Sequence, residues 1–422
     1  MGNRMRQDCD VIVLGGGPGG STLASCLALR DRRAIVLERE KFPRFHIGES
    51  LLPCSGEVFR KIGVQDVLEA KFLRKYGARF LCSATRRTAS YTFAEAFHMK
   101  FDHAYQVTRA DFDHLLLEHA RGLGADVRER WEAVEVVFEG DRAVGVRARD
   151  LSKPEEIVEL RAPMVVDATG RDTLLASRSR RKAKIARLDK TAFYTHYRNT
   201  FREEGPLEGN IQIIVWDHGW FWFIPFRGDL TSVGAVASAD WIREQRKSGA
   251  KEPADFFDRA VASSCWAKEF LANATRERQV GSIADFSYRI DQLAGDGWLF
   301  VGDAAGFLDP LFSTGAHLAV KSADLAAAAI DEALARGDTS RAAFVEYERS
   351  VRYAVDLFLG VVQAFYKGEF RETIFEANQR ATLRRIITSV LSGDVFHQGA
   401  GPQPHWASFL VKQYPAELPS FA

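Results

Sequence analysis

Three glycines near the start of the chain stand at the spacing of a phosphate-binding turn. The stretch DCDVIVLGGGPGG, from residue 8, is a short β-type run followed by Gly15, Gly17 and Gly20, and a helical pattern comes next. Gly15 would permit a tight turn, Gly17 would let the backbone approach a pyrophosphate, and Gly20 would let the helix pack close to the strand. Free N–H groups at a helix start bind phosphate, and Pro18 and Gly19, which lie at this helix start, are assigned to the same predicted site.

An acidic residue at the end of the next predicted strand completes this pattern. Glu38 ends the run AIVLE, about 20 residues after the glycines, where a carboxylate accepts hydrogen bonds from a ribose hydroxyl. Its neighbour Arg39 is assigned to the same site. Glycines alone would be weak evidence, but the strand, the helix and the carboxylate together predict a bound dinucleotide. At this point NAD and FAD both remain open.

Two later segments favour FAD. FVGDAAG brings Asp303 from a β run to a helix expected over about residues 315–335, and MVVDATGRDT places Asp167 and Gly170 after another strand. Together with the glycine turn, these segments resemble the FAD fold of the p-hydroxybenzoate hydroxylase-like superfamily. The resemblance implies that Asp303 holds the ribityl chain. It also implies that the helix points its N-terminus at the isoalloxazine ring.

The run GWFWFIPF, residues 219–226, alternates large aromatic side chains before a proline. In a strand Trp220, Trp222 and Ile224 share one face, while Phe221 and Phe223 share the other. Both faces must therefore be covered. Taken alone, the run is most often the central strand of a sheet that is packed on two sides.

Several motifs, however, resemble the signatures of flavin-dependent halogenases. The aromatic run contains W-x-W-x-I-P, a lysine lies in FLRKYGARF, and KFPRFHIGESLLP is similar to the flavin-lining stretch of these enzymes. The resemblance covers almost the whole chain and is to the branch that acts on phenols and pyrroles. The residues concerned are Gly48, Glu49 and Ser50, Lys75, and the motif F-x-x-P-x-x-S-x-G as Phe307, Pro310, Ser313 and Gly315.

The resemblance implies a halide site beside the flavin. Reduced FAD and O2 would supply the oxidant that turns chloride or bromide into hypohalous acid. Thr314 and Gly315 are the predicted chloride ligands, since they lie at a helix start, where free N–H groups and the positive end of the helix dipole favour an anion. The flavin itself is expected to contact Gly48, Ser50, Arg109 and Pro310.

Lys75 and Ser313 are the predicted catalytic residues. Hypohalous acid must reach an organic substrate that does not touch the flavin, and the amine of Lys75 would steer or carry the halogen. An ammonium in an apolar wall has a lowered pKa and becomes a better nucleophile. A single lysine is usually a solvated surface charge, and Arg74 and Lys71 are alternatives. Trp220, Trp222 and Ile224 would then separate the isoalloxazine ring from the substrate.

One position departs from the tryptophan-specific halogenases. Those enzymes have a glutamate immediately before the motif serine, whereas this chain has Phe312. The change disfavours tryptophan as the substrate. Phenol and pyrrole rings need less activation, and the sequence does not name the base that would remove the ring proton.

The superfamily topology predicts an α/β protein in which two domains interleave. A Rossmann-like FAD-binding domain would comprise residues 8–75, 104–190 and 278–340, and an antiparallel substrate-binding sheet residues 76–103 and 191–277. A helix is expected over 107–120. Apolar residues from Phe344 to Phe365 recur at helical spacing and predict a long amphipathic helix, and the resemblance implies that residues 341–422 form a helical region that covers the substrate cavity. Phe365, Tyr366 and Phe370 are candidates for lining that cavity.

Composition narrows the possible partners. Lys and Arg number 57 against 56 Asp and Glu, so a general nucleic-acid-binding surface is not expected. Five scattered cysteines without metal-ligand spacing predict free thiols, a cytoplasmic protein and no metal site, and no apolar run is long enough to span a membrane. A basic run could dock an acidic carrier protein, although such runs are usually solvated: Arg178, Arg180, Arg181, Lys182, Lys184 and Arg187.

The sequence therefore predicts a two-component halogenase that uses chloride or bromide and O2. A separate flavin reductase would supply the reduced FAD, and the substrate would be a small aromatic ring, free or tethered to a carrier protein. The alternative is a flavin hydroxylase or a prenyl reductase of the same superfamily, against which the paired tryptophans argue. A non-catalytic flavin-binding protein is the third possibility.

Overall fold

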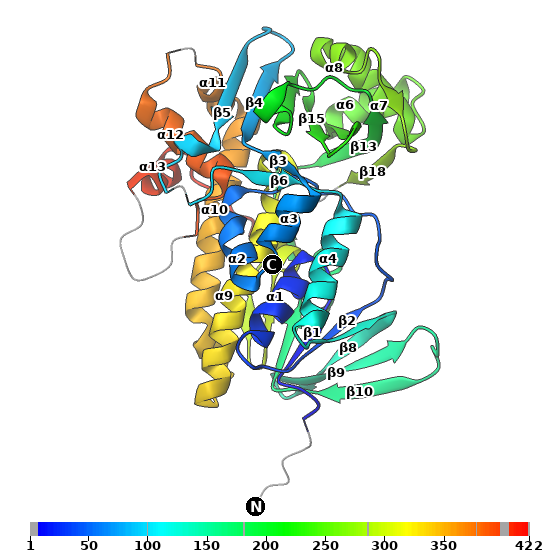
Figure 1. Ribbon diagram of the computed structural model, residues 1–422, viewed down its shortest axis with the longest axis vertical. Helices are drawn as coiled ribbons and strands as arrows, with labels where there is room; N and C mark the ends of the chain where they lie inside the picture. Colours follow the sequence, from blue (N-terminus) through cyan, green and yellow to red (C-terminus); the bar gives the residue numbers. More distant parts are fainter. Residues whose placement is uncertain are drawn as a thin grey trace, which may run out of the picture.

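The computed structural model describes residues 7–98, 100–179, 182–284, 287–376, 378–396 and 405–420. Its two main sheets lie at opposite ends of the molecule, and the long helices α9 (Thr314–Arg336) and α10 (Val345–Lys367) run along one side (Figure 1). The chain crosses between the two sheets several times. The predicted α/β fold class, with a Rossmann-like sheet, a second sheet and C-terminal helices, is confirmed.

The first sheet has six strands in the order β20-β21-β11-β1-β2-β7, parallel except for the edge pair β20–β21. The strands β1, β2, β11 and β21 are buried throughout, as expected of a sheet covered on both faces. Their bounds are β1 Val11–Leu14, β2 Ala34–Glu38, β7 Asp126–Glu129, β11 Met164–Asp167, β20 Ala294–Gly295 and β21 Trp298–Phe300.

Helices and a small sheet cover the first sheet. Helix α1 (Pro18–Ala28) packs between α9 and α4 (Arg109–Gly122), and α9 and α4 start within two residues of their expected positions. The strands β8 (Trp131–Glu139), β9 (Arg142–Asp150) and β10 (Ile157–Arg161) form a separate antiparallel sheet that contacts β2 and β11. The helices α2 (Gly56–Ile62) and α3 (Gln65–Lys71) follow the connection from β2.

The second sheet has eight strands, in the order β17-β13-β16-β15-β14-β4-β5, with β18 also paired to β13. It is antiparallel as expected, except that β14 and β4 run parallel. The bounds are β4 Gly77–Cys82, β5 Thr88–Thr92, β13 Lys190–Arg198, β14 Ile211–Trp216, β15 Gly219–Pro225, β16 Leu230–Ser238, β17 Thr275–Arg276 and β18 Gly281–Ala284. The pair β3 (Leu73–Lys75) and β6 (Ala104–Gln106) lies between the two main sheets (Figure 1).

Strand β15 is the aromatic run, and both of its faces are buried. Phe221 and Phe223 belong to an apolar cluster beneath the helices α6 (Ala239–Lys247), α7 (Pro253–Ser263) and α8 (Cys265–Phe270). Trp220, Trp222 and Ile224 belong to a different cluster that is shared with the C-terminal helices. The alternation predicted from the sequence is therefore present.

The C-terminal region is helical, with α10 followed by α11 (Glu369–Ile374), α12 (Ala381–Ser392) and α13 (His405–Gln413). The apolar side chains of α10 that recur at helical spacing are buried in two clusters: Tyr347 and Val351 belong to the core of the first sheet, and Ala354, Phe358, Val361 and Phe365 belong to the cluster at the second sheet. No helix among the described residues is both long and apolar enough to cross a membrane. The five cysteines are free, and the cytoplasmic location stays a prediction.

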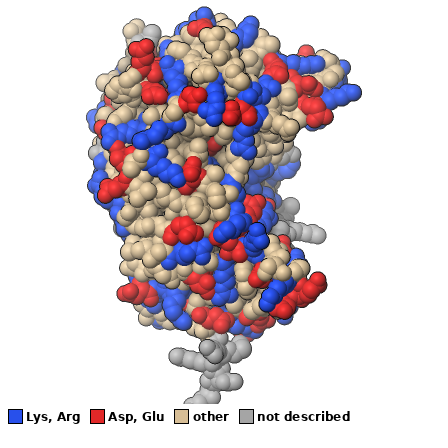
Figure 2. All heavy atoms as spheres, turned by 45° about the vertical axis from the view of Figure 1, so that its right-hand side comes forward, with Lys and Arg blue, Asp and Glu red and all other residues tan. Residues whose placement is uncertain are grey.

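Acidic and basic side chains are mixed on the face of the molecule that Figure 2 shows, where Lys and Arg lie among Asp and Glu. Many charged side chains of the described residues form ion pairs, such as Arg198 with Asp229 and Glu277. This mixture gives no extended field of one sign on the face shown.

Gly234 on β16 tests whether packing holds Trp222 in place. A Cβ added at Gly234 would lie 2.1 Å from the Trp222 ring, which cannot move far within a packed cluster. We expect Gly234→Ala to lower the free energy of unfolding by about 1–3 kcal/mol, measured by urea denaturation. The control is Gly122→Ala on α4, whose Cβ would meet nothing within 4 Å. Equal stability of the two variants would contradict this packing account.

Candidate active site

The glycine turn between β1 and α1 leaves space that suits a pyrophosphate. Gly15 has a φ of +96°, and a Cβ there would lie 2.5 Å from the carbonyl oxygen of Ala168. A Cβ on Gly20 would lie 1.9 Å from the carbonyl oxygen of Gly15, so the helix can approach the strand only without a side chain. The nearest atom to a Cβ on Gly17 is the Arg44 side chain at 3.7 Å, and this glycine lines an open groove. These features fit FAD at this position.

Glu38 is buried, and its carboxylate binds the turn itself. One carboxylate oxygen accepts from the N–H of Gly16 at 2.7 Å, and the other accepts from the N–H of Glu40 at 2.8 Å. Carboxylate oxygens have further lone pairs, and Glu38 lines the groove, so the ribose role stays a prediction. Arg39 lies at the exposed edge of the groove, where it pairs with Asp172 at 2.6 Å.

The groove continues into a deeper, mostly apolar pocket. The groove runs from Glu38 and Trp131 to Asp303. The pocket extends from Asp303 to the tryptophans of β15. The two cavities share part of their lining, which is the arrangement required by an elongated cofactor. The shared residues include Pro18, His46, Arg109, Arg171, Asp303 and Ala319.

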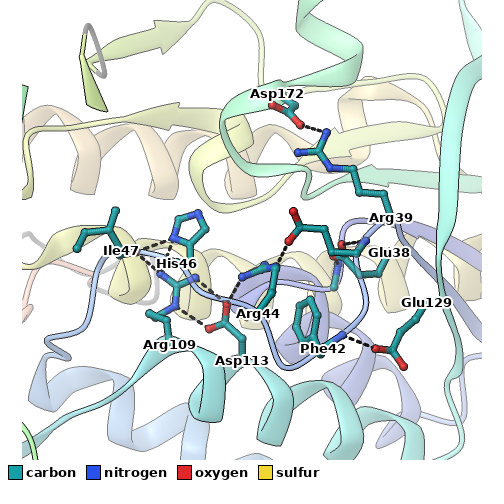
Figure 3. A network of polar contacts seen from close by, with 12 residues as sticks. Glu38, Arg39, Phe42, Arg44, His46, Ile47, Arg109, Asp113, Glu129 and Asp172 are labelled. Carbon is teal, nitrogen blue, oxygen red and sulfur yellow. Dashed lines mark hydrogen bonds and ion pairs between the residues drawn. The ribbon is translucent and has the colours of Figure 1, made fainter. Parts of the chain in front are cut away.

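Arg109 lies at this junction and is held by a network of polar contacts (Figure 3). Its guanidinium donates to both carboxylate oxygens of Asp113, at 2.6 and 2.9 Å, and to the carbonyl oxygen of Ile47 at 2.7 Å. Arg44 binds the same carboxylate at 3.0 Å. The charge of Arg109, together with burial, lowers the pKa of His46 to about 4, so this imidazole is neutral near pH 7. Asp113 thus ties residues 44–47 to helix α4.

Asp303 occupies the wall shared by the groove and the pocket. Burial raises the pKa of its carboxyl to about 6, although the charges of Arg109 and Arg171 oppose the shift. The group is therefore mostly ionised at pH 7 and can accept hydrogen bonds from a cofactor hydroxyl, which is compatible with the predicted ribityl contact. Asp167 is buried instead behind the groove, where it accepts from the N–H groups of Thr169 and Leu175.

The tryptophan face of β15 forms the far wall of the pocket. Trp220, Trp222 and Ile224 all line it, together with Ala192 from β13 and Ile211 from β14 of the same sheet. Trp222 is fixed by a hydrogen bond from its indole N–H to Ser232 at 3.1 Å. The wall is both a packed core and a pocket lining.

The predicted halide residues face the same pocket. Pro310, Ser313, Thr314 and Gly315 line it where α9 begins. Ser313 has a φ of +57°, a left-handed turn that starts the helix, and no side chain of the described residues caps the first turn. The N–H groups of that turn therefore remain available to an anion, and a Cβ on Gly315 would lie 3.8 Å from Asp303.

Lys75 is buried, whereas the two alternative cations lie at the surface. The Lys75 side chain is 2% exposed, and its Nζ donates to the Ser50 hydroxyl at 2.9 Å and to the Leu51 carbonyl oxygen at 3.1 Å. Burial lowers the pKa of this amine to about 7. Lys71 and Arg74 are exposed and pair with acidic side chains. Ser50 also lines the pocket, so one hydroxyl joins Lys75 to the pocket wall.

The aromatic candidates of the C-terminal region lie elsewhere. Phe312 is buried away from the pocket lining and packs edge-on against Phe365 and Phe370, at ring separations of 6.2 and 5.9 Å. The position that carries a glutamate in the tryptophan-specific enzymes is an apolar anchor for α10 and α11 in this chain.

Sequence reasoning missed a buried acid–base pair in the pocket wall. Glu49 is 1% exposed, and one of its carboxylate oxygens accepts from Nε2 of His196 at 3.0 Å. The other oxygen has no partner among the described residues, and Glu49 lines the pocket. No spacing pattern could have revealed the pair, since 147 positions separate the two residues. Asp113 could have been found, because it stands four residues after Arg109 on a predicted helix.

Comparison with known proteins agrees with this geometry. The family model described as tryptophan halogenase matches residues 10–98 and 80–392, two overlapping stretches that include most of the chain. A chlorinase of 1H-pyrrole-2-carbonyl-[peptidyl-carrier protein] from Pseudomonas fluorescens is 32% identical over 412 residues, with 92% of this chain and 90% of that protein covered. This chain belongs to the tryptophan halogenase family.

Solved structures of similar proteins extend the agreement to the whole fold. The flavin-dependent brominase Bmp2 has a TM-score of 0.85 and 27% identity, with 96% of this chain and 98% of that chain covered. The myxobacterial chondrochloren halogenase CndH, described as a variant of FAD-dependent halogenases, has a TM-score of 0.80 and 34% identity, with 98% of each chain covered. A flavoprotein/dehydrogenase from Cytophaga hutchinsonii is also similar, with a TM-score of 0.83, 28% identity and coverage of 92% and 93%.

Membership of this family confirms the halogenase activity and the FAD cofactor that the sequence predicts. The individual roles of Lys75, Ser313, Thr314 and Gly315 in this halogenase stay predictions.

Replacing Lys75 by methionine separates chemistry from folding. Lys75→Met keeps the length of the side chain and removes a buried charge, so we expect FAD binding to persist. We expect halogenation to fall by about 100-fold or more. In the wild-type halogenase, turnover should decrease as the pH falls below about 7, because the amine becomes protonated. Product formation at several pH values and a flavin titration measure these effects.

The stability of the wild type and of Lys75→Met gives an independent check of the pKa of the Lys75 amine. Its value in the folded state is lower than in the unfolded chain, so burying the ammonium costs most below pH 7, and the cost disappears by about pH 10.5. Lys75→Met should therefore be more stable than the wild type at pH 6, with a difference that shrinks as the pH rises. Lys71→Met, at an exposed position, should change neither activity nor stability.

Proposed function

We propose that this halogenase chlorinates or brominates an electron-rich pyrrole or phenol and uses reduced FAD from a separate reductase. The observation that carries the proposal is the position of Ser50. Ser50 lines the pocket in which the first turn of α9 and the tryptophan wall meet, and its hydroxyl accepts a hydrogen bond from the buried Lys75. Lys75 itself is not among the lining residues, so an amine of lowered pKa lies directly behind the wall of a pocket that also contains the first turn of α9.

Each group of residues has a distinct task in this mechanism. FAD, when bound and reduced, supplies the oxidation of halide by O2 to hypohalous acid. The N–H groups at Thr314 and Gly315 hold the halide near the flavin end of the pocket. Trp220 and Trp222 keep the organic substrate from the flavin, so that only a small oxidant leaves.

The neutral amine of Lys75 completes the transfer. It attacks the halogen of hypohalous acid, and hydroxide leaves and takes a proton from the amine, so that a haloamine and water form. The aromatic carbon then attacks that halogen, the N–halogen bond electrons return to the nitrogen, and the proton that the ring loses ends on this nitrogen, which restores the neutral amine. Only the neutral amine has the lone pair that the first step needs.

Two relatives support a tethered pyrrole as the substrate. The chlorinase from Pseudomonas fluorescens and a 31% identical brominase from Pseudoalteromonas luteoviolacea both act, by their names, on a pyrrole-2-carbonyl group on a peptidyl-carrier protein. Phe312 argues against tryptophan, although a tryptophan 2-halogenase from Chondromyces crocatus is also 32% identical. The sequence contains a single Gly-x-Gly-x-x-Gly fingerprint after a strand, which fits reduced flavin from a separate reductase but does not distinguish it from a single-component hydroxylase.

Mass spectrometry of the products tests the proposed function. The protein is incubated with reduced FAD, O2 and chloride or bromide, together with phenols, pyrrole-2-carboxylate and the same pyrrole on a carrier protein. We expect a chlorine or bromine isotope pattern, strongest for the tethered pyrrole. A gain of one oxygen without halogen would instead identify a hydroxylase, and halogenation of tryptophan alone would contradict the substrate assignment.

A basic surface is the proposed docking site for the carrier protein. Lys182, Lys184 and Arg187 of the basic run are exposed, whereas Arg180, Arg181 and the side chain of Arg178 lie outside the described residues. We expect charge reversal of Arg181 and Lys184 to raise KM for the tethered substrate several-fold at low salt, and less at high salt. KM for the free substrate is the control. An unchanged KM for the tethered substrate would contradict the proposal that the carrier protein docks at this surface.

A further inference from the structure

The hydroxyl of Tyr366 joins segments that the proposed mechanism needs in fixed positions. Tyr366 lies near the end of α10 and is half-buried. Its oxygen accepts from the indole N–H of Trp220 at 2.9 Å, and its O–H donates to Asp309 at 2.7 Å. A helix of the C-terminal region therefore contacts both the tryptophan wall and the loop before α9.

Asp309 connects this hydroxyl to the halide turn. Its side chain is fully buried, and its second carboxylate oxygen accepts from the N–H of Leu311 at 3.1 Å. Two residues later the N–H of Ser313 donates to the carbonyl oxygen of Pro310 at 3.0 Å, and Ser313 then takes the left-handed conformation. The carboxylate thus sets the shape of the turn that presents the first N–H groups of α9.

These groups do not have the features of a catalytic base. Neither Tyr366 nor Asp309 lines the pocket, and the hydroxyl and both carboxylate oxygens are engaged in the hydrogen bonds just described. The ammonium of Lys190, on β13, lies 4.5 Å from the centre of the Tyr366 ring and adds an attraction from the second sheet. The hydrogen bonds and the contact with Lys190 all hold Tyr366 in place.

We propose that Tyr366 is a positioning residue that fixes the halide turn relative to the tryptophan wall. Its hydroxyl links Trp220 to Asp309, so that the anion site at Thr314 and Gly315 keeps a constant place beside the wall. This inference rests on the proposed halide site, and it assigns to the C-terminal helix a part in halide binding. The aromatic ring of Tyr366 alone could not perform this role.

The variant Tyr366→Phe keeps the ring and removes the link. We expect the KM for chloride and for bromide to rise about fivefold or more, the equivalent of one lost hydrogen bond, while the dissociation constant of FAD stays unchanged. KM for the organic substrate should change less than KM for halide. The matched control is Tyr353→Phe on the same helix, since the Tyr353 hydroxyl has no hydrogen-bond partner among the described residues.

A second readout does not depend on turnover. The unfolding temperature of the FAD-loaded protein is measured while chloride replaces a large inert anion at constant ionic strength. Binding to the folded state should raise this temperature in the wild type and in Tyr353→Phe, and less so in Tyr366→Phe. Asp309→Asn, which weakens the same link from its other side, should resemble Tyr366→Phe. If either Tyr366→Phe or Asp309→Asn folds poorly, the other variant still provides the test.

The outcomes distinguish this inference from the proposed function. If Tyr366→Phe binds halide as the wild type does, or if Tyr353→Phe loses halide affinity equally, the inference is wrong even though the wild type halogenates. If the wild type incorporates no halogen, the proposed function is wrong. The chloride dependence of the unfolding temperature would in that case still decide whether Tyr366 supports an anion site.

Discussion

The linking segment, residues 44–51, provides the buried polar contacts that hold the two ends of the molecule together. Arg44 binds Asp113 on α4, Glu49 binds His196 on β13, and the Ser50 hydroxyl accepts from Lys75 on β3. The contacts of Glu49 and Ser50 are buried and that of Arg44 is partly buried, and an unpaired charge is costly where water is excluded. One short stretch of chain therefore contacts the flavin groove, the second sheet and the amine.

The same constraint explains the chemistry of the pocket. An apolar setting lowers the pKa of Lys75 and raises that of Asp303, so each group moves toward its neutral form. The amine becomes available as a nucleophile near neutral pH, while the carboxyl, with Arg109 and Arg171 nearby, stays mostly ionised at pH 7. In the proposed mechanism, the tryptophan wall of this pocket separates the organic substrate from the flavin. One apolar enclosure thus sets both reactivity and selectivity.

The C-terminal helices contribute to the site through contacts rather than by lining the pocket. Phe312 anchors α10 and α11 through Phe365 and Phe370, and Tyr366 reaches the wall and the loop before α9. The sequence predicts an amphipathic helix here and proposes these aromatics as cavity-lining residues. Their actual partners depend on how α10 crosses the second sheet, and helical periodicity contains no information about that crossing.

The sequence alone determined the features that follow from local geometry. Glycine spacing requires a turn at Gly15 and close packing at Gly20, strand alternation separates Trp220 from Phe221, and helical spacing predicts α9 and α10. The family motifs add the chemistry. Only the tertiary structure decided which of the neighbouring cations is buried, that Glu49 meets His196, and that Tyr366 bonds to Asp309. These pairs unite distant segments, and burial and partnership arise only when such segments pack together, so a linear pattern cannot specify them.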